Sequence, residues 1–168
     1  FHPEVSTLET PVSLSGFFQS YKYFLDSQDT VRHALRSMTN PSTWFDQQVT
    51  RLRDIGEWVA VHVRLGDYLE QSTKDFHGVA GPNYFRRALS NVSDIMGTLP
   101  IVVFSDDPAG AELILDLPAN REVHVMQAPP ESRAIETVNL MSMSAASVIA
   151  NSSFGWWGAW LGERKDRP

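Results

Sequence analysis

The chain has 168 residues, of which 42% are hydrophobic and 20% charged, a balance typical of a globular domain rather than of a disordered or fibrous chain. Its net charge of −6 argues against a general nucleic-acid-binding protein, whose surface would be basic. The absence of cysteine excludes disulfides, zinc–thiolate sites and cysteine nucleophiles. No apolar run reaches the roughly 20 residues needed to span a membrane, and we expect a cytoplasmic protein, or one peripheral to a membrane.

The two ends of the sequence indicate a piece of a longer protein. The chain begins with Phe1 rather than Met, and it ends at Pro168, shortly after a Trp-rich segment. The first residues also lack the basic start and apolar stretch of a signal peptide. We therefore expect this chain to be a fragment of a longer protein.

Residues 1–57 are predicted to form an N-terminal loop and helical segment. Residues 1–16 are rich in Ser, Thr and Pro, which favours extended or loop structure. Asp29 is positioned to cap a first short helix, and Ser42 to cap a second, longer one that Gly56 ends.

From residue 58 onward, short β-branched apolar runs alternate with helical segments. Residues 58–63 are predicted to form a buried strand, followed by a polar loop and a helix that Pro82 begins. The same unit repeats, with strands at 100–104, 122–126 and 147–150 and helices at 109–116 and 134–145, and residues 154–161 are predicted to form a turn or a helix. This alternation predicts an α/β fold, in which residues 58–168 form a Rossmann-like parallel sheet with helices on both faces.

Polar loops follow three of these strands, at residues 64–67, 105–107 and 151–154. In parallel sheets, ligands bind beyond the carboxyl ends of the strands. All three loops contain donors suited to phosphate oxygens or sugar hydroxyls, so they are the candidate ligand site.

Arg64 comes just after the first buried strand, where a guanidinium can make a bidentate contact with a phosphate. Gly66 lets the chain turn and a ligand approach the backbone. Asp67 can orient Arg64 or bind a sugar hydroxyl, and His62 lies on the same strand face as Arg64. The residues alone favour neither this interpretation nor its alternative, in which Arg64 and Asp67 form a structural ion pair and His62 is a core histidine with its hydrogen bonds made.

The loop after the fourth strand contains Asn151, Ser152 and Ser153, whose hydroxyl and backbone amide donors suit an anion. Three tryptophans follow, at 156, 157 and 160, and could stack on a base or sugar. We expect two of the three to pack in the core instead.

Asp106 and Asp107 follow the second strand, and paired carboxylates can hold a hard cation. Asp107 also precedes a proline at a helix start, which favours a capping role over a metal site.

No glycine-rich motif of a P-loop or dinucleotide-binding protein is present, and no Gly-x-Ser-x-Gly motif of a serine hydrolase.

Four segments together carry a resemblance to a known family: Gly16–Phe24, His62–Tyr68, Phe104–Asp107 and Leu140–Leu161. In order and spacing they resemble family 11 glycosyltransferases, the α-1,2-fucosyltransferases. The final segment, with its Asn-Ser-Ser-Phe and Trp-Trp-Gly-Ala-Trp sequences, is the most specific of the four.

The resemblance implies a GT-B-like fold, of which this chain would supply the half that binds the donor. The donor would be GDP-fucose, and fucose would move with inversion to the 2-hydroxyl of a galactose-terminated glycan. It implies neither a metal nor another cofactor. The alternative is a truncated or degenerate domain that binds the nucleotide sugar without transferring it.

By position in the motifs, the resemblance places Arg64 on the diphosphate. The attacking hydroxyl would need a base, and Asp67, Glu70 and Asp75 are the carboxylates near enough in sequence to be candidates for it. The remaining residues implied in donor binding are His62, Gly66, Thr137, Asn151, Ser152, Ser153 and Phe154.

Three departures from the family pattern bear on activity. Leu65 stands where a second arginine is usual, and Thr137 stands where an aspartate that reads guanine is usual. Glu136 is adjacent, but it would point elsewhere if the segment is helical. The family's N-terminal Gly-Asn-Gln-Met segment is absent.

Overall fold

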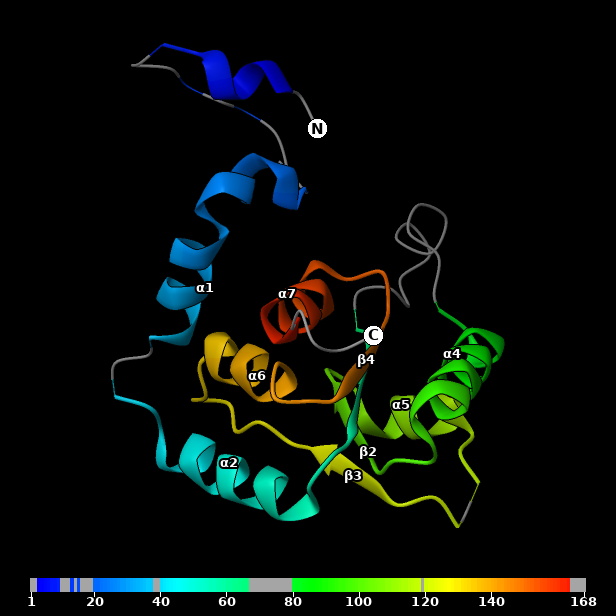
Figure 1. Ribbon diagram of the computed structural model, residues 1–168. Coiled ribbons are helices and arrows are strands. Elements are labelled where there is room, and N and C mark those ends of the chain that lie inside the picture. Colours follow the sequence, from blue (N-terminus) through cyan, green and yellow to red (C-terminus); the bar gives the residue numbers. More distant parts are fainter. Residues whose placement is uncertain are drawn as a thin grey trace. The chain divides into compact units, whose positions relative to one another are not determined.

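The computed structural model describes residues 3–9, 13, 15, 20–37, 40–66, 80–118 and 120–163, and it divides the chain into two compact units (Figure 1). The first unit runs from Phe1 to Thr39, and the second from Asn40 to Pro168. Among the described residues, no helix has both the length and the apolarity required to cross a membrane.

The first unit contains the 3-10 helices η1 (Pro3–Thr7) and η2 (Tyr21–Ser27) and the α-helix α1 (Gln28–Arg36). The side chain of Ser20 caps η2 by accepting a hydrogen bond from the backbone N–H of Lys22 (3.3 Å). The predicted cap of α1 is wrong: Ser27 occupies the cap position, and Asp29 lies inside the first turn. A carboxylate is also favourable there, because it faces the positive end of the helix dipole.

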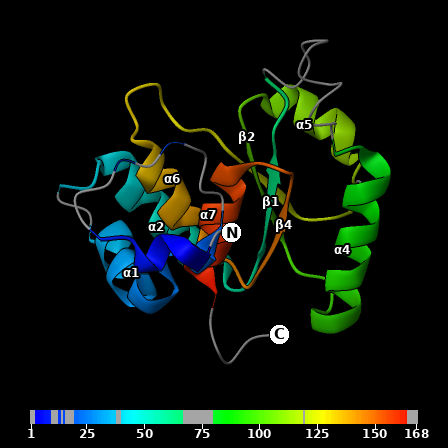
Figure 2. The same cartoon turned by 90° about the horizontal axis from the view of Figure 1, so that it is seen from above.

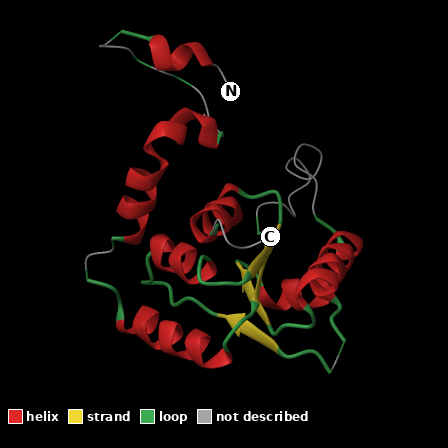
Figure 3. Cartoon of the chain, viewed as in Figure 1, coloured by secondary structure: helices red, strands yellow, loops and turns green. Residues whose placement is uncertain are grey.

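The second unit is built on a four-stranded parallel sheet, as predicted (Figure 3). Its strands are β1 (Val59–Val63), β2 (Ile101–Ser105), β3 (Val123–Met126) and β4 (Ala146–Ile149), in the order β3-β2-β1-β4. The pairings β1–β2, β1–β4 and β2–β3 are all parallel and in close register, so the carboxyl ends of the strands lie together.

Helices cover both faces of this sheet (Figure 2). One face carries α4 (Pro82–Met96) and α5 (Pro108–Leu115), each of which begins with a proline in its first turn. The other face carries α2 (Thr43–Ile55), α6 (Ala134–Met141) and α7 (Ser153–Gly162). The predicted Rossmann-like architecture is therefore confirmed.

Strand alternation along β1 divides the apolar residues into two cores. Val59, Val61 and Val63 face α4 and α5 and pack with Phe85 and its neighbours. Ala60 faces the opposite way, into a core that includes Leu52 of α2. His62 shares the face of Ala60, so its side chain is directed toward the layer of α6 and α7.

Helix α2 belongs to the second unit, whereas the sequence placed the domain boundary after residue 57. The helix joins the sheet because its apolar stripe, which includes Leu52, packs on the same core as Trp58. Its caps are those predicted: the side chain of Ser42 accepts from the N–H of Phe45 (3.1 Å), and Gly56 follows with φ +86°.

Helix α6 ends at Met141, four residues earlier than predicted. The hydroxyl of Ser142 donates to the carbonyl of Asn139 (2.7 Å), and the side chains of Ser144 and Ser147 also bond to each other (3.2 Å). These serine side chains offer local hydrogen bonds that compete with a continued helix.

Replacing Phe85 by alanine should lower the free energy of unfolding by about 3–5 kcal/mol, because the ring is fully buried between α4 and the sheet. Urea denaturation measures this change. As a matched control, Leu113→Ala removes an apolar side chain that is 82% exposed on α5, and it should change stability by no more than about 0.5 kcal/mol. Equal costs for the two variants would contradict this assignment of the core.

Candidate functional site

A cavity of about 670 Å³ opens at the carboxyl end of the sheet. It is lined by residues that end or follow all four strands, together with one residue from α6 and one from α5. The lining residues are His62, Arg64, Phe104, Ser105, Asp106, Pro108, Met126, Gln127, Ala128, Thr137, Ser152, Ser153 and Phe154. The cavity therefore brings together side chains from all three polar loops that the sequence marked as a ligand site.

The strand order explains why the cavity forms at this place. From β1 the chain moves to β2 and β3 on one side, and then returns to place β4 on the other side of β1. Such a reversal is a topological switch point, where the connecting loops diverge and leave a crevice. Arg64 follows β1 and Ser152 follows β4, so both lie at the switch point.

Arg64 forms an ion pair with Asp106 across the ends of β1 and β2, with 3.0 Å between Nη1 and Oδ2. The predicted partner, Asp67, lies outside the described residues. Asp106 also accepts hydrogen bonds from the N–H groups of Leu65 (3.0 Å) and Gly66 (2.9 Å). Burial would raise the pKa of Asp106, but the bond from Leu65, the charge of Arg64 and the bond from Gly66 together hold this pKa below its ordinary value.

Leu65 does not face the cavity. Its side chain is 2% exposed and packs in the core on the α4 and α5 side of the sheet. A side chain at position 65 therefore points away from Arg64, which lines the cavity.

Asp107 has the capping role that the sequence favoured. Its carboxylate accepts from the N–H of Gly110 at the start of α5 (3.0 Å), and its own N–H donates to the hydroxyl of Ser105 (3.1 Å). Within the described part of the chain, no three carboxylate or imidazole side chains gather in a way that would hold a metal ion.

His62 is buried, but it is not a core histidine with all of its hydrogen bonds made. Its side chain is only 5% exposed, and its ring lies against Phe154 with 5.7 Å between centroids. Burial lowers the pKa of His62 to about 4, with Asp106 opposing and Arg64 assisting the shift, so the ring is neutral at pH 7. Its Nδ1 has no hydrogen-bond partner, and a satisfied core histidine would have one.

The start of α7 contributes a second set of donors. Ser152 is the cap residue, but its hydroxyl makes no capping bond, and the first bond within the helix runs from Trp156 N to Ser152 O (3.0 Å). The backbone N–H groups of residues 153–155 precede that bond, at the positive end of the helix dipole. Ser152, Ser153 and Phe154 line the cavity as predicted, whereas Asn151 is exposed outside its lining.

None of the three tryptophans of α7 lines the cavity. Trp160 is buried, and its ring contacts those of Trp156 (5.9 Å between centroids) and Trp157 (5.5 Å). The rings of Trp156 and Trp157 are partly exposed and lie 4.9 Å apart. The three rings therefore form one packed cluster, and stacking on a ligand in the cavity is not their role.

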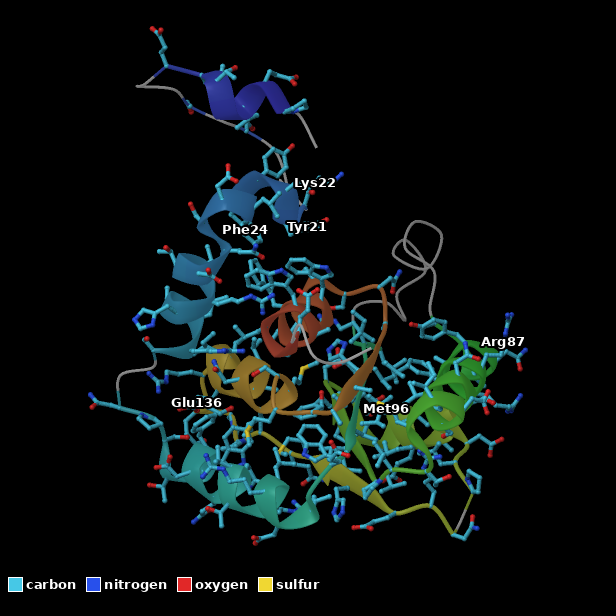
Figure 4. All side chains as sticks on the ribbon, in the orientation of Figure 1. Tyr21, Lys22, Phe24, Arg87, Met96 and Glu136 are labelled. Carbon is cyan, nitrogen blue, oxygen red and sulfur yellow. The ribbon has the colours of Figure 1, made fainter. Side chains whose placement is uncertain are left out.

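Thr137 lines the cavity from α6, whereas the neighbouring Glu136 is not part of the lining, as expected for consecutive helix residues. Glu136 lies on the side of α6 that meets α2 (Figure 4). Glu136 is fully buried and accepts from the N–H (2.8 Å) and hydroxyl (3.0 Å) of Ser42 and from Arg133 (3.0 Å). Burial alone would raise the pKa of Glu136, but these bonds lower it overall. Its hydrogen bonds to Ser42 join α6 to the start of α2.

Several residues of the site were not predicted. Asp106 was considered only as half of a carboxylate pair for a cation, although it lines the cavity, and Met126, Gln127 and Ala128 were not considered. The rule that directs attention to strand ends would have found the last three, because Gln127 immediately follows β3. Of the predicted residues, Gly66 lies beside the lining, and Asp67, Glu70 and Asp75 lie outside the described residues.

A cavity at the switch point of a parallel sheet, lined by one arginine and three serines beside a helix start, resembles the phosphate-binding sites of α/β proteins. The family model for glycosyl transferase family 11 matches residues 6–166. The chain belongs to this family of α-1,2-fucosyltransferases, as the sequence resemblance predicted.

Curated relatives share 26–38% of aligned residues with this chain. The O-antigen biosynthesis glycosyltransferase WbnK of Escherichia coli is 38% identical over 64% of this chain and 35% of its own length. An alpha-1,2-colitosyltransferase of Escherichia coli is 27% identical over 92% and 53%. A galactoside 2-alpha-L-fucosyltransferase of Caenorhabditis elegans is 26% identical over 89% and 42%. This chain thus spans about a third to a half of these relatives.

Among solved structures, the chain is similar to POFUT1 in complex with GDP, with a TM-score of 0.53 and 15% sequence identity. The match covers 76% of this chain and 45% of the POFUT1 chain. At this identity the likeness is one of fold: the parallel sheet and its helices match about half of the POFUT1 chain.

Folding stability should depend on the neutral state of His62. Its pKa is lower in the folded chain than the 6.5 of an unperturbed histidine, so the contribution is complete above pH 6.5 and is lost as the pH falls toward 4. Wild type should lose about 3 kcal/mol over this interval relative to His62→Asn. Urea denaturation at several pH values measures the difference, and parallel pH profiles for the two proteins would contradict the neutral buried ring.

Removing the charge of Glu136 should destabilise the chain at pH 7. Glu136→Gln turns an amide NH2 toward Ser42 or Arg133, and the expected cost is about 1.5–3 kcal/mol. Because the folded-state pKa lies below the ordinary 4.5, the difference should shrink as the pH falls below that value. Thermal denaturation measures the stability of Glu136→Gln. The control is Glu112→Gln, on the exposed side of α5, whose stability should equal that of wild type.

Proposed function

We propose that this chain is the donor-binding part of an inverting glycosyltransferase that moves L-fucose from GDP-fucose to the 2-hydroxyl of a galactose-terminated glycan. The observation that carries the proposal is the position of Arg64, Ser152 and Ser153 around one cavity at the switch point of the sheet. Family membership supports the reaction class, and the name of the Caenorhabditis elegans relative supports both the sugar and the acceptor.

The polarity of the cavity suggests how the donor lies. Its guanidinium follows β1 and two of its serines follow β4, whereas the lining residues at and after the end of β3 are neutral: Met126, Gln127 and Ala128. Strands lie about 4.8 Å apart, so the ends of β4 and β3 are separated by roughly 14 Å, which suits an extended nucleoside diphosphate. The diphosphate then lies at Arg64 and the start of α7, and the base lies over β3 beside Thr137. The GDP bound to POFUT1 is consistent with this ligand class.

In such a complex the protein would act on the leaving group. Negative charge develops on the diphosphate as the bond to fucose breaks, and preorganised donors stabilise that charge. Arg64 supplies a guanidinium, Ser152 and Ser153 supply hydroxyls, and the dipole of α7 adds partial positive charge. Asp67 and Glu70 stay candidates for the base that takes the proton of the acceptor hydroxyl.

Leu65 does not argue against this reaction. Because position 65 faces the core on the other side of the sheet, the absence of an arginine there removes no donor from the cavity. Two arguments for a binding-only protein remain: Thr137 stands where an aspartate is usual, and the chain spans only 35–53% of the three relatives.

Arg64→Ala should weaken GDP binding by about 10- to 100-fold, because a charge-assisted contact to phosphate contributes about 1.5–3 kcal/mol. Titration calorimetry with GDP, UDP and ADP gives the affinities and the base preference. Arg87→Ala is the matched control, since Arg87 is exposed on α4 (Figure 4). Equal GDP affinity for Arg64→Ala and wild type would remove the phosphate role.

A transfer assay then separates an enzyme from a binding protein. The 168-residue chain, and a longer form joined to a preceding half from a relative, are each given lactose and labelled GDP-fucose or GDP-colitose. Product from GDP-fucose supports the proposed reaction, and product from GDP-colitose alone assigns the sugar named for the second relative. Tight GDP-fucose binding without any product in either form supports the binding-only alternative.

A further inference from the structure

The carboxylate of Asp106 holds the start of the loop that follows β1. It receives three donors from three consecutive residues: the guanidinium of Arg64 at 3.0 Å and the N–H groups of Leu65 at 3.0 Å and Gly66 at 2.9 Å. Both oxygens take part, because Leu65 donates to Oδ1 while Gly66 and Arg64 donate to Oδ2. Asp106 itself is fixed at the end of β2, which is paired with β1.

Residue 66 must be glycine for this arrangement. A Cβ at that position would lie 2.5 Å from Oδ2 of Asp106, which is closer than real Cβ atoms approach another heavy atom. The need is one of space, since the chain must pass directly against the carboxylate. The same carboxylate therefore accounts for both Gly66 and the orientation of Arg64.

The loop is held from its other side by Leu65, whose side chain is buried against α5. With the side chain of Leu65 in the core and its N–H on Asp106, the backbone leading out of β1 has little freedom. A guanidinium is a rigid planar fork with five N–H donors, so the contact of Nη1 with Asp106 restricts the directions in which the rest of the fork can point.

We propose that Asp106 is a positioning residue for the donor diphosphate: it holds the Arg64 guanidinium and the 65–66 backbone in the orientation in which Arg64 meets phosphate. This inference rests on the proposed function for the identity of the ligand. It assigns to Asp106 the orienting role that the sequence alone suggested for Asp67.

Two other roles for the same carboxylate make different predictions. A general base needs an oxygen open to the acceptor hydroxyl and a pKa near the working pH, whereas both oxygens of Asp106 are engaged and its pKa is lowered. A carboxylate that merely repels the diphosphate would weaken GDP binding in wild type, so that its removal would strengthen binding.

The test compares Asp106→Asn with Gly66→Ala in the full 168-residue chain. Asn removes the charge and keeps the shape, and whichever way its amide is turned, an NH2 group faces one of the three donors. Gly66→Ala keeps the charge but pushes the carboxylate aside. Calorimetry should show GDP affinity about tenfold lower in both variants, with guanosine affinity unchanged. When Arg64 is already alanine, adding Asp106→Asn should lower the GDP affinity by less than about twofold.

Amide hydrogen exchange gives a readout that needs no ligand. Exchange at Gly66 should be faster in Asp106→Asn than in wild type, because its N–H loses a charged acceptor. Asp116→Asn is the matched control: Asp116 is an exposed residue at the end of α5, and the variant should equal wild type in every measurement.

The outcomes separate the two proposals. Equal or tighter GDP binding by Asp106→Asn overturns the positioning role, and so does unchanged exchange at Gly66. Loss of guanosine affinity along with GDP affinity also overturns it, because the effect would then be general unfolding of the site. Failure of wild type to bind GDP would refute the proposed function instead, and the exchange measurement would still decide the role of Asp106.

Discussion

The site depends on one geometric constraint, the alternation of side chains along β1. The strand is buried on both faces, so each residue must serve one of two cores. Val61 and Val63 anchor it against α4 and α5, which leaves His62 on the opposite face and lets Arg64 follow it into the cavity. Leu65 then returns to the first core. The position of the arginine is thus fixed by the packing of its apolar neighbours, and a shift of one residue would bury the charge.

The second constraint is electrostatic. The chain carries a net charge of −6, yet its cavity is suited to an anion, because the field at a site depends on nearby groups and not on the total charge. Here one carboxylate faces one guanidinium, and the start of α7 adds positive potential without adding a titratable group. A neutral His62 beside them adds no charge at pH 7, since burial lowers its pKa to about 4.

Local sequence patterns predicted most of the fold, and tertiary contacts account for what they missed. The four strands and the caps at Ser42 and Asp107 depend on residues that are close in sequence, so local patterns were enough to predict them. The partner of Arg64 lies 42 positions later, and Glu136 bonds to Ser42 across 94 positions. Such pairs form only after strands and helices assemble, so the orienting role was assigned to Asp67, which is near in sequence. The early end of α6 has a similar origin, in serine side chains whose preference depends on the turn into β4.

The geometry of α6 also limits which side chains could recognise the base of a bound nucleotide. Helix geometry turns consecutive residues by about 100°, so Glu136 cannot take the place of a carboxylate at position 137. It is occupied instead in joining α6 to Ser42, with every oxygen bonded. The described lining residues on α6 and at the end of β3 are neutral, and Thr137 and Gln127 are the polar ones among them. Neutral hydrogen bonds are roughly half as strong as charge-assisted ones, so these residues should discriminate less sharply among bases than a carboxylate would. In the proposed complex, the affinity for a nucleoside diphosphate would then depend mainly on Arg64 and the first turn of α7, where the diphosphate is proposed to lie.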